Sequence, residues 1–210
     1  MSEPIIVQHP LIQDKLTHMR DKNTDSGMFR TLANEISELL GYEATRNLQT
    51  YEQEIQSASG TTVKFPMVKS KGIAIVSILR AGNGMLDGML RLIPSAQVGH
   101  IGLYRDPKSF TVIEYYFKVP ENMQQKDVFV IDPMIATGHS ACAAVNRIKE
   151  TMPKSITFIC LVASPEGVAY LQSNHSDITI FTAAVDNGLD TRNYIVPGLG
   201  DAGDRMFGTQ

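Results

Sequence analysis

Short apolar runs alternate along the chain with segments whose apolar residues recur at helical spacing. The runs are rich in β-branched residues and too short for helices, so they predict buried strands. They cover residues 73–79, 128–131, 156–163 and 178–184. Apolar residues at offsets of three, four and seven occur in 10–19, 29–40, 85–93 and 141–148. This alternation predicts an α/β fold, a mainly parallel sheet flanked by helices.

The first sixty residues predict an N-terminal helical segment. One helix opens at His9-Pro10, and Ser26 is expected to cap a second, with an interruption at Gly41. Weak alternation over 61–68 is compatible with a strand.

A β-hairpin arm is expected between the first and second apolar runs. Residues 97–104 form one predicted strand, and the aromatic-rich, alternating stretch 111–119 forms the other. The turn between them is Asp106-Pro-Lys-Ser109. We expect this arm to be able to fold over a site and exclude water.

Composition narrows the classes of protein. The 210 residues suit a single domain, 1–210, and a net charge of −3 offers no global basic field for nucleic acid or an anionic membrane. Cys142 and Cys160 lack a CxxC spacing and are expected to be buried and reduced. The N-terminus lacks a basic region before a long apolar core, and the uncharged run 72–79 is too short to span a bilayer, so we expect a cytoplasmic protein.

The stretch 128–145 predicts a strand, a loop and a helix in succession. Asp132-Pro133 ends the strand because proline cannot donate to a ladder, and the loop 136–140 precedes the helix. The free N–H groups of a helix N-terminus favour an anion there, and Thr137 and Ser140 add hydroxyl donors. Asp132 is placed to accept hydrogen bonds from sugar hydroxyls, so the stretch suits a ribose 5-phosphate. An ordinary strand–helix unit with a polar turn remains the alternative.

Two stricter phosphate-binding patterns are absent. The sequence contains no G-x-x-x-x-G-K-[ST], which argues against a Walker loop. The glycines of 82–88 are one residue too far apart for G-x-G-x-x-G. ATP hydrolysis and dinucleotide binding are therefore disfavoured.

Residues 128–141 resemble the loop with which phosphoribosyltransferases bind 5-phospho-α-D-ribose 1-diphosphate (PRPP). A single acid followed by proline, as in 132–138, is similar to the uracil phosphoribosyltransferase branch in particular. The resemblance implies a type I phosphoribosyltransferase-like fold. It also implies PRPP binding by Asp132, Pro133, Met134, Ile135, Ala136, Thr137, Gly138, His139 and Ser140.

Two arginines follow predicted strands in segments that resemble the same family. Leu79-Arg80-Ala-Gly82 and Tyr104-Arg105-Asp106 imply that Arg80 and Arg105 hold the pyrophosphate of PRPP. A guanidinium suits this role because its planar fork bonds two phosphate oxygens and stays charged. The alternative for each arginine is a solvated surface charge.

The C-terminal stretch 193–205 is rich in glycine and aspartate, and we expect neither a regular helix nor a regular strand there. It resembles the uracil loop of the family, which implies that Ile195, Gly200, Asp201 and Ala202 surround the base. Backbone N–H and C=O groups can match the acceptor–donor–acceptor edge of uracil without room for a purine. Asp201 is the candidate catalytic residue, assisting N1 of the base or binding the metal–pyrophosphate. The alternative is a turn-rich tail.

The resemblance implies that uracil and PRPP are converted to UMP and pyrophosphate in pyrimidine salvage. Mg²⁺ would arrive with PRPP, without direct protein ligands. A homodimer or homotetramer is implied, and GTP activates some members. Two rival functions stay open: a phosphoribosyltransferase for another base, and a pyrimidine-sensing RNA-binding regulator on the same fold, which would need a basic face.

The sequence departs from the family pattern at three positions. His139 replaces a glycine, Asn83 stands where an apolar residue is usual, and Gly27 stands where a lysine is common. A positive φ at His139 would strain the backbone. We expect His139 either to make phosphate binding pH-dependent or to point into solvent.

Overall fold

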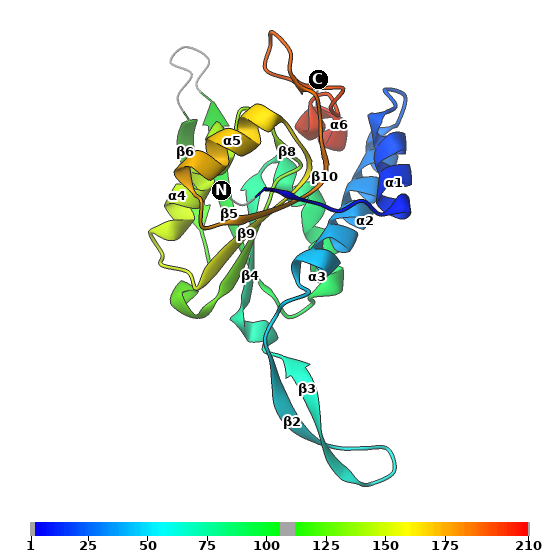
Figure 1. Ribbon diagram of the computed structural model, residues 1–210, viewed down its shortest axis with the longest axis vertical. Coiled ribbons are helices and arrows are strands. Elements are labelled where there is room, and N and C mark those ends of the chain that lie inside the picture. Colours follow the sequence, from blue (N-terminus) through cyan, green and yellow to red (C-terminus); the bar gives the residue numbers. More distant parts are fainter. Residues whose placement is uncertain (1–2, 106–111, 210) are drawn as a thin grey trace.

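The computed structural model describes residues 3–105 and 112–209. Within these residues a central sheet of eight strands has the order β1-β10-β9-β7-β4-β5-β6, with β8 paired to β9 (Figure 1). All of its pairs are parallel except β5 with β6. The strands are β1 (Ile5–Ile6), β4 (Ile73–Leu79), β5 (Gln97–Arg105), β6 (Val112–Lys118), β7 (Asp127–Ile131), β8 (Met134–Ile135), β9 (Ser155–Ala163) and β10 (Thr179–Val185).

Helices cover both faces of this sheet. The first face packs against α1 (Pro10–Arg20), α2 (Ser26–Ala44), α3 (Leu86–Leu92) and α6 (Ala202–Phe207). The second packs against α4 (His139–Lys149) and α5 (Pro165–Asn174). Alternation along β7 shows the two layers, because Phe129 and Ile131 join the first core while Val128 and Val130 join the second. The predicted α/β fold is confirmed.

The second helix differs from its prediction at both ends. Asp25, rather than Ser26, is the N-cap, and its side chain accepts a hydrogen bond from the Met28 N–H. The helix also continues through Gly41 to Ala44. A Cβ at Gly41 would lie 2.6 Å from the Met89 sulfur. The glycine therefore allows α2 and α3 to approach closely and does not interrupt the helix.

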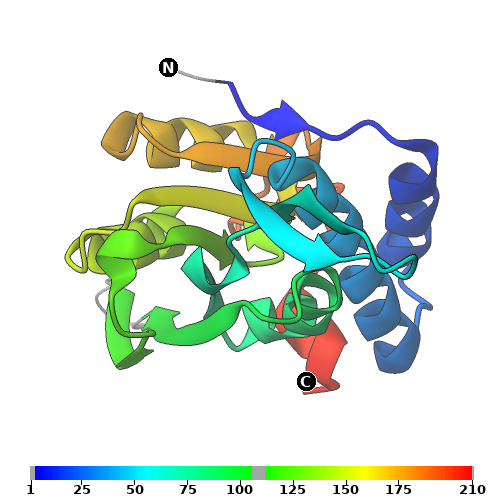
Figure 2. The same cartoon turned by 90° about the horizontal axis from the view of Figure 1, so that it is seen from below.

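A second hairpin lies apart from the central sheet. β2 (Thr50–Gln56) pairs antiparallel with β3 (Thr62–Val68), and the pair projects away from the rest of the molecule (Figure 1). Figure 2 looks from the side of this hairpin, which lies in front of the other elements. The strand expected at 61–68 is confirmed, but a helical reading of residues 50–56 was wrong. Nearly all of β2 is exposed on both faces, so its sequence carries no apolar alternation from which a strand could be predicted.

The predicted hairpin of β5 and β6 is confirmed as an antiparallel pair, with a register shift between Gly102 and Leu103. The pair forms one edge of the central sheet (Figure 1). The expected turn, Asp106 to Ser109, lies outside the described residues.

Both cysteines are free and buried, as predicted. Burial raises the pKa of the Cys160 thiol to about 12. In the part of the chain that the structure describes, no helix is both long and apolar enough to cross a membrane.

Candidate active site

The loops singled out from the sequence meet at one edge of the sheet. β4, β7, β9 and β10 run parallel, so their carboxyl ends share that edge, uppermost in Figure 1. Open α/β sheets bind ligands at this edge. A hollow of about 160 Å³ lies here, lined by Ala81 and by residues of the 132–141 loop.

The loop after β7 is held against β9 by backbone hydrogen bonds. The Asp132 N–H donates to the Ile159 carbonyl (3.2 Å), and the Pro133 carbonyl accepts from Leu161 N–H (3.0 Å). Further on, the Ser164 hydroxyl donates to the Ala136 carbonyl (2.6 Å). The loop therefore has a fixed path before any ligand is bound.

Two glycines let this loop lie directly on α5. Gly138 has φ of +79°, and a Cβ there would approach the Gly167 carbonyl to 2.6 Å. A Cβ on Gly167 would collide with the Ala136 carbonyl oxygen. Gly138 is also the N-cap of α4, and its carbonyl accepts the first helical bond, from Cys142 N–H. The N–H groups of residues 139–141 bond to no described residue, which leaves them available to an anion at this helix N-terminus.

His139 occupies the first helical position of α4. The positive φ belongs to Gly138, and the backbone strain considered for His139 is absent. The imidazole Nδ1 lies 2.9 Å from the Thr137 hydroxyl, and the ring stacks on Tyr170 with centroids 4.4 Å apart. His139 is exposed, as one of the two expectations has it, and its ring also contacts Thr137 and Tyr170.

Asp132 lies at the carboxyl end of β7. Burial raises the pKa of its carboxyl group to about 8. The carboxyl oxygens form no hydrogen bond with any residue that the structure describes. Removing such a polar group from water costs folding free energy, and no described residue offsets that cost. The side chain is available to the hollow that it lines.

Arg80 follows β4 and reaches the C-terminal segment. Its guanidinium lies 3.4 Å from an Asp204 carboxylate oxygen and 3.3 Å from the Thr209 hydroxyl. Side chains at Gly82 and Gly84 would collide with the Ile131 carbonyl and with Met206, so the turn after Arg80 is wedged between β7 and α6. The Asn83 side chain is exposed, and nothing in the structure explains its departure from the family pattern.

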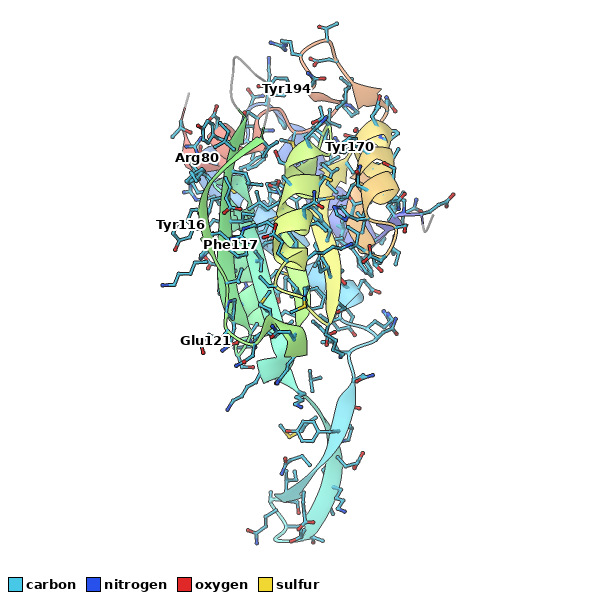
Figure 3. The ribbon with its side chains drawn as sticks, turned by 90° about the vertical axis from the view of Figure 1, so that its left-hand side faces the viewer. Arg80, Tyr116, Phe117, Glu121, Tyr170 and Tyr194 are labelled. Carbon is cyan, nitrogen blue, oxygen red and sulfur yellow. The ribbon has the colours of Figure 1, made fainter. Side chains whose placement is uncertain are left out.

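Arg105 is the last residue of β5 and pairs through its backbone with Val112. Its side chain is outside what the structure describes. In Figure 3, Arg80, Tyr170 and Tyr194 lie toward the same end of the molecule, opposite the β2–β3 hairpin.

The C-terminal stretch contains more regular structure than predicted. β12 (Ile195–Val196) pairs with β11 (Gly188–Leu189), and α6 begins at Ala202. The Asp201 carboxylate caps α6 by accepting from the Asp204 N–H (2.9 Å), and Ala202 and Met206 are buried one turn apart. The N-cap hydrogen bond of Asp201 and the helical spacing of the two buried residues explain why this short helix forms.

The four expected base-loop residues divide into two pairs. Ile195 and Ala202 are buried, whereas Gly200, with φ of +70°, and Asp201 are exposed. The exposed pair lies between the buried pair in the chain. The backbone of the 195–202 segment is therefore exposed at Gly200 and Asp201, while the buried side chains of Ile195 and Ala202 hold the segment to the core.

Sequence analysis missed three residues that hold this segment. Arg205 donates to the carbonyls of Met19 (2.7 Å) and Leu199 (2.9 Å). Arg20 and Asp186 form an ion pair that also contacts Gly198. Of these three residues, only Asp186 could have been selected from the sequence, because it directly follows an apolar strand. Arg80 was selected by the same criterion.

This sheet order, with a phosphate-type loop between its central strand and a helix, defines a phosphoribosyltransferase fold. A hypoxanthine-guanine phosphoribosyltransferase from Bacillus anthracis shares it, with a TM-score of 0.52 at 14% identity over 74% of this chain and 80% of that one. The AQ2163 protein from Aquifex aeolicus matches far better, with a TM-score of 0.95 at 32% identity over 99% of both chains.

Sequence relatives identify the branch. The family model for uracil phosphoribosyltransferase matches residues 6–209. A uracil phosphoribosyltransferase from Legionella pneumophila is 57% identical over 98% of this chain and 95% of its own length. One from Rhodococcus jostii is 55% identical over 98% of each. The chain belongs to the uracil phosphoribosyltransferase family.

Proposed function

We propose that this protein transfers the phosphoribosyl group of PRPP to N1 of uracil, giving UMP and pyrophosphate in pyrimidine salvage. The observation that carries the proposal is the junction of β7 and α4. There the Asp132 carboxyl group and the first N–H groups of α4 line one hollow, and none of them bonds to a described residue, a combination suited to a sugar phosphate. Family membership over residues 6–209 supports the choice of base.

The loop 132–140 would hold the ribose 5-phosphate. N–H groups at the start of α4, with the hydroxyls of Thr137 and Ser140, donate to the phosphate. Asp132 accepts from ribose hydroxyls, and these bonds favour its ionised form. Because the loop is already fixed on β9 and α5, little ordering is needed before the sugar is in place for attack.

Arg80 and Arg105 would hold the pyrophosphate as the bond between C1 and its oxygen breaks. Arg80 is exposed and its contact with Asp204 is long, 3.4 Å, so it can exchange that partner for phosphate oxygens. Among the described residues, no group of three or more His, Cys, Asp or Glu side chains could hold a metal ion. In this proposal Mg²⁺ arrives as part of the PRPP substrate, where it would screen the pyrophosphate charge.

The segment 195–202 would bind uracil. Exposed backbone at Gly200 can donate to and accept from the pyrimidine edge, while Ile195 and Ala202 fix the segment from the core. The reaction forms the N1–C1 bond, breaks the C1–oxygen bond, and releases the N1 proton. Asp201 is the proposed acceptor of that proton or a contact to the metal–pyrophosphate. Its Oδ1 caps α6, and its other oxygen bonds to no described residue.

We also propose that the protein acts in the cytoplasm as a homodimer or homotetramer. The projecting β2–β3 hairpin supports self-association, because Tyr51, Phe65 and Met67 are exposed on it. Activation by GTP stays a proposal that rests on the family resemblance alone. Light scattering tests the oligomeric state, and the rate of UMP formation with and without GTP tests the activation.

The reaction is tested by incubating the purified protein with uracil, PRPP and Mg²⁺ and quantifying both products. UMP and pyrophosphate should appear in equal amounts. Omission of uracil should abolish the release of both. Pyrophosphate without UMP, or neither product, would overturn the proposal.

A further inference from the structure

The side chains of Thr137, His139 and Tyr170 contact one another at the start of α4. The Tyr170 ring, on α5, stacks on the His139 imidazole at 4.4 Å between centroids and 29° between planes. The same ring lies over Gly138, where a Cβ would come 3.2 Å from its Cδ1 atom. His139 in turn places Nδ1 2.9 Å from the Thr137 hydroxyl. Tyr170 thus fixes the ring that contacts Thr137.

The direction of the His139–Thr137 hydrogen bond decides what Thr137 can offer a ligand. If Nδ1 is unprotonated, the hydroxyl donates its hydrogen to the ring and presents only lone pairs outward. If Nδ1 carries a proton, the ring donates to Thr137, and the hydroxyl hydrogen is free. The phosphate dianion has no proton to donate, so it can accept a hydrogen bond from Thr137 only in the second arrangement.

We propose that Tyr170 is a positioning residue for phosphate binding, which holds His139 so that its Nδ1–H donates to Thr137 and directs the Thr137 hydroxyl hydrogen toward the phosphate. The inference rests on the proposed function, in which the loop 132–140 binds ribose 5-phosphate. The neutral Nδ1–H tautomer satisfies this arrangement, and the imidazolium ion enforces it. The contribution of His139 to phosphate binding should therefore grow as pH falls, because a protonated ring leaves Nδ1 only as a donor.

Other titratable groups surround this assembly and must be separated from His139. The loop contributes Asp132, and α5 contributes Glu166 and the Tyr170 phenol, while the α4 N-terminus adds a positive dipole. The phosphate of the ligand also titrates near pH 6. No described carboxylate forms an ion pair with His139. All of these contributions are shared by wild type and a His139 variant, so the ratio of their dissociation constants isolates the imidazole.

The test uses ribose 5-phosphate as the probe, with binding measured by calorimetry on the full-length protein. Tyr170→Leu removes the aromatic face, and Tyr170→Phe keeps it as the matched control. We expect Tyr170→Leu to weaken binding about two- to tenfold, in line with the usual strength of aromatic stacking, while Tyr170→Phe changes it less than twofold. In turnover assays the Leu variant should raise the KM for PRPP and leave kcat within about twofold.

The second arm compares His139→Gly with wild type between pH 8 and pH 5.5. The dissociation constant of His139→Gly divided by that of wild type should grow about tenfold as pH falls. An unchanged ratio, or a Tyr170→Leu variant that binds the probe like wild type, would overturn the proposal. So would a parallel loss of kcat with unchanged probe binding. The probe undergoes no reaction, so these binding results do not depend on uracil being the substrate. If the proposed function fails, wild-type protein should bind ribose 5-phosphate and make no UMP.

Discussion

The Arg20 guanidinium and the Asp186 carboxylate are joined at two points, Nη2 to Oδ1 at 2.7 Å and Nη1 to Oδ2 at 2.9 Å. Arg20 ends α1, and Asp186 directly follows β10. Nη1 also donates to the Gly198 carbonyl (2.8 Å), and the Gly198 N–H donates to Asp186 (2.9 Å). The pair therefore holds Gly198, which lies within the proposed uracil segment 195–202.

Replacing Arg20 by lysine should weaken uracil binding. A lysine keeps the charge but cannot bond Asp186 at two points and reach Gly198 as well. We expect the KM for uracil to rise several-fold with a smaller change in the KM for PRPP, and the free energy of unfolding to fall by about 1–3 kcal/mol, because the Asp186 side chain is only 6% exposed. Steady-state kinetics and denaturant unfolding measure both. Arg91→Lys, at an exposed pair with Glu38, is the control and should change neither.

A methyl group at Gly167 should disturb the phosphate loop from a distance. The added Cβ would meet the Ala136 carbonyl, which is backbone and cannot rotate away. Gly167→Ala is expected to raise the KM for PRPP at least about tenfold and to leave the KM for uracil nearly unchanged. Gly72→Ala provides the control, since its Cβ would meet only Gln125 O at 3.5 Å. Equal behaviour of the two variants would refute the close packing of the loop on α5.

Asp132→Asn should stabilise the folded protein, by an amount that depends on pH, and should weaken PRPP binding. Its pKa, near 8 in the folded protein, lies above the ordinary value for aspartate, so the folded state holds a proton that the unfolded chain releases. Wild-type stability must therefore fall as pH rises from about 4 to 8, and an asparagine avoids this loss. Relative to wild type, the variant should gain about 1–3 kcal/mol, or several degrees in Tm, between pH 5 and pH 8.

The same variant should bind PRPP more weakly, because an amide is a poorer acceptor for ribose hydroxyls than a carboxylate. Thermal unfolding across the pH range tests the expected change in stability, and the KM for PRPP at pH 8 tests the expected loss of binding. Asp14→Asn, at an exposed position on α1, is the control and should follow wild type. A variant whose stability relative to wild type does not change with pH would show that the pKa of Asp132 is not raised in the folded protein.

Local sequence patterns predicted the elements that build the centre of the site. The junction of β7 and α4 was predictable because a buried strand, a breaker and a helical face follow one another in eighteen residues, 128–145. β2 was not predictable, because a strand exposed on both faces has no apolar period. The stack of Tyr170 on His139 and the pair of Arg20 with Asp186 were out of reach for another reason. Their members are 31 and 166 residues apart, and only folding brings them together.

The two rival functions differ from the proposed one in what they bind. Another base would require a segment with room for it, and a regulator would require a basic face for RNA. The net charge of −3 and the anchored backbone at 195–202 favour neither. An RNA gel shift addresses the regulator, and no shift is expected.

The central claim is the choice of base, and pyrophosphate release from PRPP and Mg²⁺ tests it most directly. Uracil should be compared with adenine, xanthine, orotate and no base, at equal concentrations. Release with uracil at least a hundredfold above every other arm is the predicted result. Release with another base in preference to uracil, or in none of the arms while PRPP still binds, would contradict the account.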